Sequence, residues 1–249
     1  MARDRGAAHD AGLVALRLSR ISSTSSNGRH AAGALYPCLV AAAESFDVRS
    51  VAELRAIVGE PLPRVIAKET STLDERATAF IRVAPFLVMA TSASDGSTDA
   101  SPKGGPPGFV SVMDERRLAI PEFPGNRRLD GVQNLVDRPG IGLLFIVPGI
   151  TETLRVNGIA RLSRDPELSA VCAVAGRSPW FVVDVEVRQV FSHCSKAFLR
   201  SGLWSPDSWP DPATVTSPSR TIAERAADEG RPEQDVRREV DEAYRPQLY

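Results

Sequence analysis

The chain has 249 residues, 43% of them hydrophobic, so it is long enough to bury one sizeable core. Its formal net charge is −1, with charges of both signs interspersed. That balance argues against a nucleic-acid or membrane-surface role, because such roles need a basic face. No apolar run approaches the roughly 20 residues that a membrane helix requires. We therefore expect a globular protein with neither nucleic-acid nor membrane partners.

Residues 1–49 are expected to form a poorly ordered leader, because turn-forming and polar residues such as Asn27-Gly28 interrupt them. No apolar segment followed by a small-residue cleavage site occurs there, so a signal peptide is not expected. The three cysteines, Cys38, Cys172 and Cys194, are far apart and form no Cys-x-x-Cys pair. We therefore expect no metal site, no disulfide framework and a reducing cytoplasmic location.

Ordered structure is expected from Ser50. Ser50 to Glu53 and Thr72 to Glu75 each fit a capping box, with a hydroxyl and a carboxylate three residues apart. The helices that they open are expected to end at about Val58 and about Val83.

Apolar runs separated by turn signals predict strands over the rest of the domain. The expected strands are 86–91 (buried), 97–103 after an Asp95-Gly96 turn, 108–113, 118–120, 141–147, 153–162 and 180–191. Helices are expected at 126–137, after Asp165-Pro166 and at 195–200. Consecutive hairpins with one helix inserted after the fourth strand indicate an antiparallel barrel of the mainly β, α+β class. Residues 50–205 are expected to form this domain, and residues 206–249 are expected to form a tail with a short helix around 221–227.

Two segments combine groups that bind phosphate. Ser101 and Lys103 end one strand, and Asn126-Arg127-Arg128 stand where a helix is expected to begin. The first N–H groups of a helix together with Arg and Lys side chains form a ready anion site. Neither GxxxxGK[ST] nor GxGxxG occurs, so nucleotide hydrolysis and Rossmann-type binding are poorly supported. The two segments instead predict a site for a phosphate group.

Several motifs together resemble the pyridoxamine 5'-phosphate oxidase-like flavin-binding proteins, and in particular an uncharacterised bacterial subgroup. They are Phe86-Leu87-Val88-Met89-Ala90-Thr91, Ser101-Pro102-Lys103-Gly104, Pro124-Gly125-Asn126-Arg127-Arg128 and Leu154-Arg155-Val156-Asn157-Gly158. The resemblance covers about residues 50 to 205. It implies a split β-barrel that binds flavin mononucleotide (FMN). It also implies a homodimer, with FMN lying in a groove between the two subunits.

The resemblance also implies roles for single residues. Ser101 and Lys103 would hold the phosphate or the ribityl chain. Arg127 and Arg128 would grip the phosphate, and Asn126 would cap the helix or contact the ligand. The alternatives are a solvated helix face for the two arginines and a strand-end surface position for the lysine.

The same resemblance places the segment Met89, Ala90 and Thr91 at the flavin edge. Arg155 is expected either to contact the ligand or to form an interface ion pair. Mid-strand Gly158 indicates a bulge or the close approach of a ligand.

His193 and Lys196 are the candidates for catalytic acid–base roles, since they could line the mouth of the flavin pocket. The rival interpretation of His193 is a strand-end residue bonded to a local carbonyl. The Arg-x-His signature of vitamin-oxidising relatives is absent here, which argues against pyridoxamine phosphate as the substrate.

We therefore expect an FMN-dependent oxidoreductase that transfers a hydride between flavin and a small substrate or reduced nicotinamide. One alternative is a reductase that uses the deazaflavin F420 on the same fold, with Arg155 and Arg161 binding its longer anionic tail. Another is a non-enzymatic flavin or haem protein with His193 as axial ligand. The last is a structural module without a ligand.

Overall fold

The computed structural model describes residues 47–215, 224–225 and 230–244. The expected leader therefore lies outside the described residues except for 47–49, and so does most of the helix expected at 221–227. The chain divides into two compact units, Met1–Ile57 and Val58–Tyr249, and each is described by itself.

Helix α1 (Val51–Val58) begins and ends where the sequence predicted, but the first capping box forms only in part. The Ser50 hydroxyl accepts a hydrogen bond from the Glu53 N–H at 3.1 Å, and the Glu53 carboxylate accepts one from the Arg49 N–H at 2.7 Å. The larger unit begins with a short helix that was not predicted, α2 (Pro63–Ile66), which has proline at its first position.

All seven predicted strands form one antiparallel sheet in the order β2-β1-β5-β6-β7-β4-β3. They are β1 (Phe86–Ser92), β2 (Thr98–Gly104), β3 (Ser111–Asp114), β4 (Arg117–Glu122), β5 (Gly140–Ile146), β6 (Thr153–Ser163) and β7 (Phe181–His193). The expectation of an antiparallel α+β fold is confirmed.

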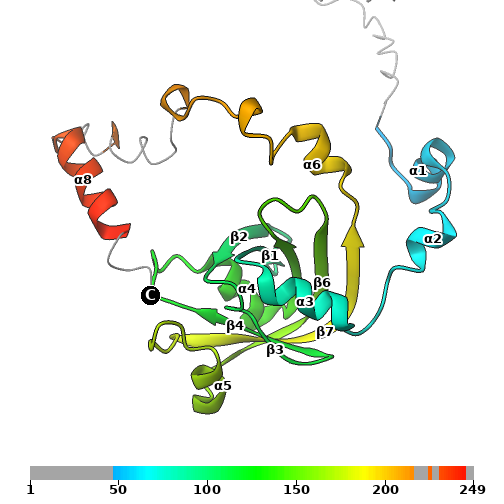
Figure 1. The fold of residues 1–249 in the computed structure, drawn as a ribbon, viewed down its shortest axis with the longest axis horizontal. Helices are drawn as coiled ribbons and strands as arrows, with labels where there is room; N and C mark the ends of the chain where they lie inside the picture. The colour runs from blue at the N-terminus through cyan, green and yellow to red at the C-terminus, as the bar shows by residue number, and fades with distance from the viewer. Residues whose placement is uncertain (1–46, 216–223, 226–229, 245–249) are drawn as a thin grey trace, which may run out of the picture. The chain divides into compact units, whose positions relative to one another are not determined.

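Four helices complete the domain: α3 (Glu75–Val83), α4 (Asp130–Asp137), α5 (Pro166–Val171) and α6 (Lys196–Ser201). Helix α4 packs against β1 and β2, α3 against β3 and β6, and α5 against β7 (Figure 1). Short 3-10 turns at Pro206–Ser208 and Pro212–Thr214 follow, and then α8 (Glu233–Tyr244). Residues 224–225, the described part of the range predicted for the tail helix, are helical, and α8 follows them.

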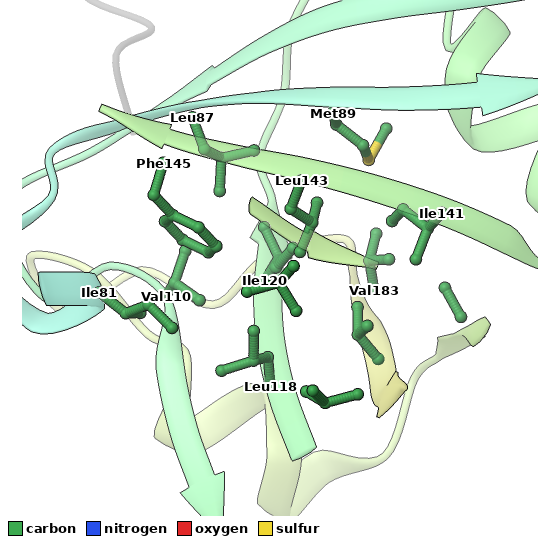
Figure 2. Close-up of a cluster of buried hydrophobic side chains, with 14 of the residues drawn as sticks. Ile81, Leu87, Met89, Val110, Leu118, Ile120, Ile141, Leu143, Phe145 and Val183 are labelled. Carbon is green, nitrogen blue, oxygen red and sulfur yellow. The ribbon is translucent and has the colours of Figure 1, made fainter. Parts of the chain in front are cut away.

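The sheet curves around one hydrophobic core. Figure 2 shows Leu87 and Phe145 from β1 and β5 pointing toward Leu118 and Ile120 of β4, with Ile81 of α3 filling the space beside them. Strands from opposite ends of the sheet order therefore share one interior, which is the arrangement of a split barrel.

Two local expectations need correction. The cap of α3 is Asp74, whose carboxylate accepts from the Ala77 N–H at 2.7 Å, and not Thr72. Strand β1 is buried on one face only: Leu87 and Met89 point into the core, while Phe86 and Ala90 are exposed. Side chains alternate along a strand, so only one face of β1 reaches the core.

Gly158 occupies a β-bulge, where the register of β6 and β7 shifts between Asn157 and Gly158. A Cβ at Gly158 would lie 2.3 Å from the carbonyl oxygen of Glu186. A neighbouring strand, rather than a ligand, therefore accounts for the glycine.

Candidate functional site

The start of α4 borders a cavity of about 380 Å³, which we call the α4 cavity. It is lined by residues 99–103 of β2, by Glu122 at the end of β4, and by 126 and 128–132. Ser101, Lys103, Asn126 and Arg128 therefore meet in one place, as the sequence predicted. Arg127 lies exposed on the same loop and is not among the lining residues.

The loop before α4 differs from the prediction. The helix begins at Asp130, not at Asn126, because Arg127 and Leu129 adopt positive φ angles of 61° and 56° that no right-handed helix accepts. Asn126 does not cap the helix: its side-chain oxygen accepts from the N–H of Arg128 at 3.0 Å. The arginines thus lie on a tight loop that leads into α4.

Gly131 lets α4 approach the sheet closely. A Cβ at this position would lie 3.1 Å from the Ser101 Oγ, 3.3 Å from the Thr91 Oγ1 and 3.4 Å from the Met89 methyl carbon. Ser101 therefore lies directly under the first turn of the helix. The N–H of Val132 in that turn already donates to the Leu129 carbonyl at 2.9 Å, so the N–H groups of Asp130 and Gly131 are the ones that a helix start offers to an anion.

Both cations of the α4 cavity are held by carboxylates. Lys103 Nζ lies 2.5 Å from Glu122 Oε2, and the two side chains are only 14% and 11% exposed. Arg128 is paired with Asp130 in an exposed position, and this hydrogen bond raises the pKa of Arg128. The first pair is fixed by burial, whereas the second can exchange its partner easily.

Asp99 adds a third carboxylate to the cavity, which makes one carboxylate more than cations among the lining side chains. Its Oδ2 accepts a hydrogen bond from the Asn134 amide at 2.7 Å, and the same amide donates to the Thr91 hydroxyl at 3.0 Å. Neither Asp99 nor Glu122 was predicted from the sequence to belong to the site. The alternation of β2 could have identified Asp99, which shares a face with Ser101.

The side chains of Met89, Ala90 and Thr91 do not share one face of strand β1. Met89 is fully buried in the core, and Thr91 is 6% exposed and bonded to Asn134. Ala90 points from the opposite face of the sheet, next to Gly142. A role at a flavin edge stays a prediction for these three residues, and only Met89 and Thr91 lie on the face that carries α4.

Arg155 and His193 belong to a cluster on the outer face of β6 and β7, opposite the core. The Arg155 guanidinium lies 5.2 Å from the centroid of the Phe191 ring, and that ring meets the His193 ring edge-on at 5.2 Å. The Arg155 Nε is buried and has no hydrogen-bond partner among the described residues. A buried N–H without an acceptor is costly, so this nitrogen is a candidate contact for a group that the described residues do not supply.

Burial lowers the pKa of His193, and the positive charge of Arg155 lowers it further. The imidazole is therefore neutral at neutral pH and free to accept a proton. Lys196 follows three residues later, exposed at the first position of α6. The catalytic roles of both residues stay predictions.

The candidate residues thus fall on opposite faces of the sheet. Ser101 and Lys103 share the inner face with Met89 and Leu87, their cross-strand partners in β1. Arg155 and His193 lie on the outer face. Within one copy of the chain, the two groups do not form a single site.

A third polar region surrounds Asp184, which is 4% exposed on β7. Arg117 donates two hydrogen bonds to its carboxylate, at 2.7 and 3.0 Å, and Arg161 is paired with it as well. The hydrogen bonds to Asp184 raise the pKa of Arg117. A groove of about 350 Å³ beside these residues is lined by charges that mostly satisfy one another.

No group of three or more His, Cys, Asp or Glu residues in the described part of the chain is arranged to hold a metal ion. No described helix has both the length and the apolar character that crossing a bilayer would need.

Residues 73–194 match the family model described as pyridoxamine 5'-phosphate oxidase. No curated protein matches the chain in sequence.

Similar solved structures include HupZ of Group A Streptococcus, with 17% identity and a TM-score of 0.40 over 48% of this chain and 93% of that one. An F420 reductase has 16% identity and a TM-score of 0.35, with coverage of 49% and 98%. An FMN-binding protein of Syntrophomonas wolfei has 6% identity and a TM-score of 0.36, with coverage of 47% and 88%.

The matched segment runs from just before α3 to just after β7, and so contains the whole sheet and the α4 cavity. Over residues 73–194 the chain therefore belongs to the pyridoxamine 5'-phosphate oxidase-like family.

Proposed function

We propose that the chain is an FMN-dependent oxidoreductase whose α4 cavity binds the phosphate and ribityl end of the cofactor. The observation that carries this proposal is the convergence of Ser101, Lys103, Asn126 and Arg128 on one cavity at the first turn of α4. A bound flavin supplies hydride transfer with a small substrate or reduced nicotinamide.

The pairing of the cations divides their roles. Arg127 has no ion-pair partner among the described residues, and Arg128 is held only by an exposed carboxylate. These two arginines can turn toward a phosphate dianion with little loss, and their planar guanidinium groups match its oxygens. They are the residues proposed to grip the phosphate.

Lys103 is less available, because its buried ion pair with Glu122 already satisfies its charge. The carboxylates of Glu122 and Asp99 are hydrogen-bond acceptors, and the hydroxyls of a ribityl chain are donors. We infer that this side of the cavity holds the polyol, while the arginine loop holds the phosphate. The excess of one carboxylate then favours a ligand with few negative charges.

The pairing of the cations also argues against the deazaflavin alternative. The longer anionic tail of F420 needs cations beyond the phosphate site, and Arg161 is already paired with the buried Asp184. We therefore propose FMN rather than F420 as the cofactor. A haem alternative would give purified protein a Soret band, and FMN gives a flavin spectrum instead.

We also propose a homodimer, because the two groups of candidate residues face opposite sides of the sheet. One flavin can meet both groups only if the second copy brings its own Arg155 and His193 to the α4 cavity of the first. The partnerless Nε of Arg155 supports this arrangement, since it lacks an acceptor in the described domain. His193, neutral at neutral pH, would then accept or donate a proton near the substrate, and Lys196 is its alternative. We expect the cytoplasm as the location, because the described cysteines Cys172 and Cys194 are free thiols.

The visible absorption spectrum of the purified full chain tests the cofactor. We expect FMN to copurify with the chain, and we expect the double substitution of Arg127 and Arg128 by Ala to abolish it. Substitution of Arg64 and Arg82, two exposed arginines outside the cavity, is the matched control and should leave the flavin in place. A double variant of Arg127 and Arg128 that stays fully yellow would count against the phosphate site.

A mixing experiment tests the dimer. Arg128→Ala removes a residue of the cavity, and Arg155→Gln removes the proposed contribution of the partner. Each variant alone should bind FMN weakly, whereas a refolded mixture should regain sites in which both groups are intact. Absence of any recovery on mixing would contradict a site shared between copies.

A further inference from the structure

A second cavity, of about 420 Å³, lies between the start of α3, the segment that follows α2, and the adjoining ends of β6 and β7. We call it the α3 cavity. Thr70 fixes its wall to the sheet, because Thr70 and Val190 exchange backbone hydrogen bonds at 3.0 and 2.8 Å. The cavity is separate from the α4 cavity and shares no lining residue with it.

The floor of the α3 cavity is apolar. Leu154 and Val190 are 6% and 4% exposed, and half-buried Phe80 of α3 lies beside them. The size of this cavity falls within the range of about 300 to 1,000 Å³ that small-molecule sites occupy. Such sites combine an apolar surface with a few polar groups, and the lining of this cavity contains both.

Four charged residues line the same cavity: Lys68, Arg76, Asp74 and Glu152. Among the residues that the structure describes, none of the four forms an ion pair. Asp74 uses Oδ1 to cap α3, and the Glu152 carboxylate accepts only a 3.4 Å hydrogen bond from Thr151. Two positive and two negative groups are therefore available to a ligand.

This distribution selects a chemical class. A simple anion would pair with Lys68 and Arg76 but would be repelled by the unpaired carboxylates. A simple cation would pair with the carboxylates but would be repelled by Lys68 and Arg76. A ligand with both charges can pair with both kinds of group, and an apolar portion can cover the floor. We propose that the α3 cavity binds a free amino acid with an apolar side chain, its carboxylate held by Lys68 and Arg76.

Three probes with the same phenyl ring separate the contributions of the charges. L-phenylalanine carries both charges, 3-phenylpropanoate only the carboxylate, and 2-phenylethylamine only the ammonium group. We expect L-phenylalanine to bind saturably to the full chain by ligand-detected NMR, and each analogue to bind at least about tenfold more weakly, because an unmatched charge costs that much. Equal binding of 3-phenylpropanoate would overturn the proposal in favour of an anion site. No saturable binding of L-phenylalanine would overturn it altogether.

Substitutions locate the site. Arg76→Gln should weaken L-phenylalanine binding by about tenfold while leaving 2-phenylethylamine unchanged, since it removes only a carboxylate partner. Lys68→Gln gives a second test on another segment. Arg82→Gln is the control, because Arg82 is an exposed arginine of the same helix outside the cavity. Unchanged L-phenylalanine binding in both cavity variants would contradict the assignment. None of these measurements involves flavin, so their outcome is independent of the proposed oxidoreductase.

Discussion

The α4 and α3 cavities differ in how the protein holds their cations. In the α4 cavity, Lys103 and Arg128 each contact a carboxylate, and the first of these pairs is nearly buried. In the α3 cavity, Lys68 and Arg76 stand exposed without an ion-pair partner among the described residues. A paired, buried cation contributes to the stability of the fold as well as to a binding site. An exposed, unpaired cation contributes to ligand binding alone.

The largest expected effect compares the two lysines directly. Lys103→Met leaves the nearly buried Glu122 carboxylate without its partner, so we expect the free energy of unfolding to fall by about 2 to 3 kcal/mol. Lys68→Met removes an exposed, unpaired charge and should change it by less than about 0.5 kcal/mol. Urea unfolding of both variants measures the two changes in the free energy of unfolding. Equal changes would contradict the distinction between a buried, paired lysine and an exposed, unpaired one. Addition of Glu122→Leu to Lys103→Met should recover most of the loss.

The next effect concerns the close approach of α4. Gly131→Val places new atoms against Ser101 and Thr91, and we expect it to cost about 2 kcal/mol and to weaken FMN binding. Gly125→Val, in the preceding loop, meets nothing within 4 Å and is the matched control. Binding of L-phenylalanine to the α3 cavity should not change in either variant. Thermal unfolding measures the loss of stability, and FMN titration of the same samples measures the loss of affinity. Unchanged stability and unchanged FMN affinity in the Gly131→Val variant would contradict the close approach of α4.

A smaller effect comes from converting a paired cation into an unpaired one. Asp130→Asn releases Arg128 and removes a negative charge beside the phosphate site, so FMN should bind severalfold more tightly. Fluorescence quenching of FMN measures the change. Asp137→Asn, at the other end of α4 and outside the cavity, should have no effect on FMN. Weaker binding in the Asp130 variant would mean that the pair positions Arg128 rather than competing for it.

The smallest effect concerns the outer face. Because the native-state pKa of His193 lies below its ordinary value of 6.5, the unfolded chain takes up the proton first as the pH falls. Stability should therefore decrease as the pH falls from 6.5 through the lower native pKa, and His193→Gln should remove this dependence. Arg155→Gln should raise the pKa of His193 in an NMR titration, since it removes a neighbouring positive charge. An unchanged pKa would show that burial alone causes the shift.

The sequence predicted the fold well where local patterns determine it. All seven strands, the Asp95-Gly96 turn and the ends of α1 and α3 follow from apolar periodicity and capping residues. The predicted start of α4, at Asn126, was wrong, because the sequence does not show that Arg127 and Leu129 adopt positive φ angles.

The candidate site divides in the same way. Ser101, Lys103, Asn126 and Arg128 line one cavity, whereas Arg127 does not, and the binding roles of all five stay predictions. Glu122 was missed, because its pairing with Lys103 depends on how β4 and β2 meet in space. The prediction kept Met89, Ala90 and Thr91 together, although strand alternation could have separated Ala90 from the other two. The far-face position of Arg155 and His193 follows only from the assembled sheet.

The most direct test of the central claim compares the affinities of FMN and riboflavin for the full chain. These ligands differ only in the phosphate, so their affinity ratio reports the contribution of the site at the start of α4. We predict that FMN binds far more tightly than riboflavin, and that the Arg127→Ala, Arg128→Ala double variant removes most of the difference. Equal affinities, or a ratio that the double substitution leaves unchanged, would contradict the account.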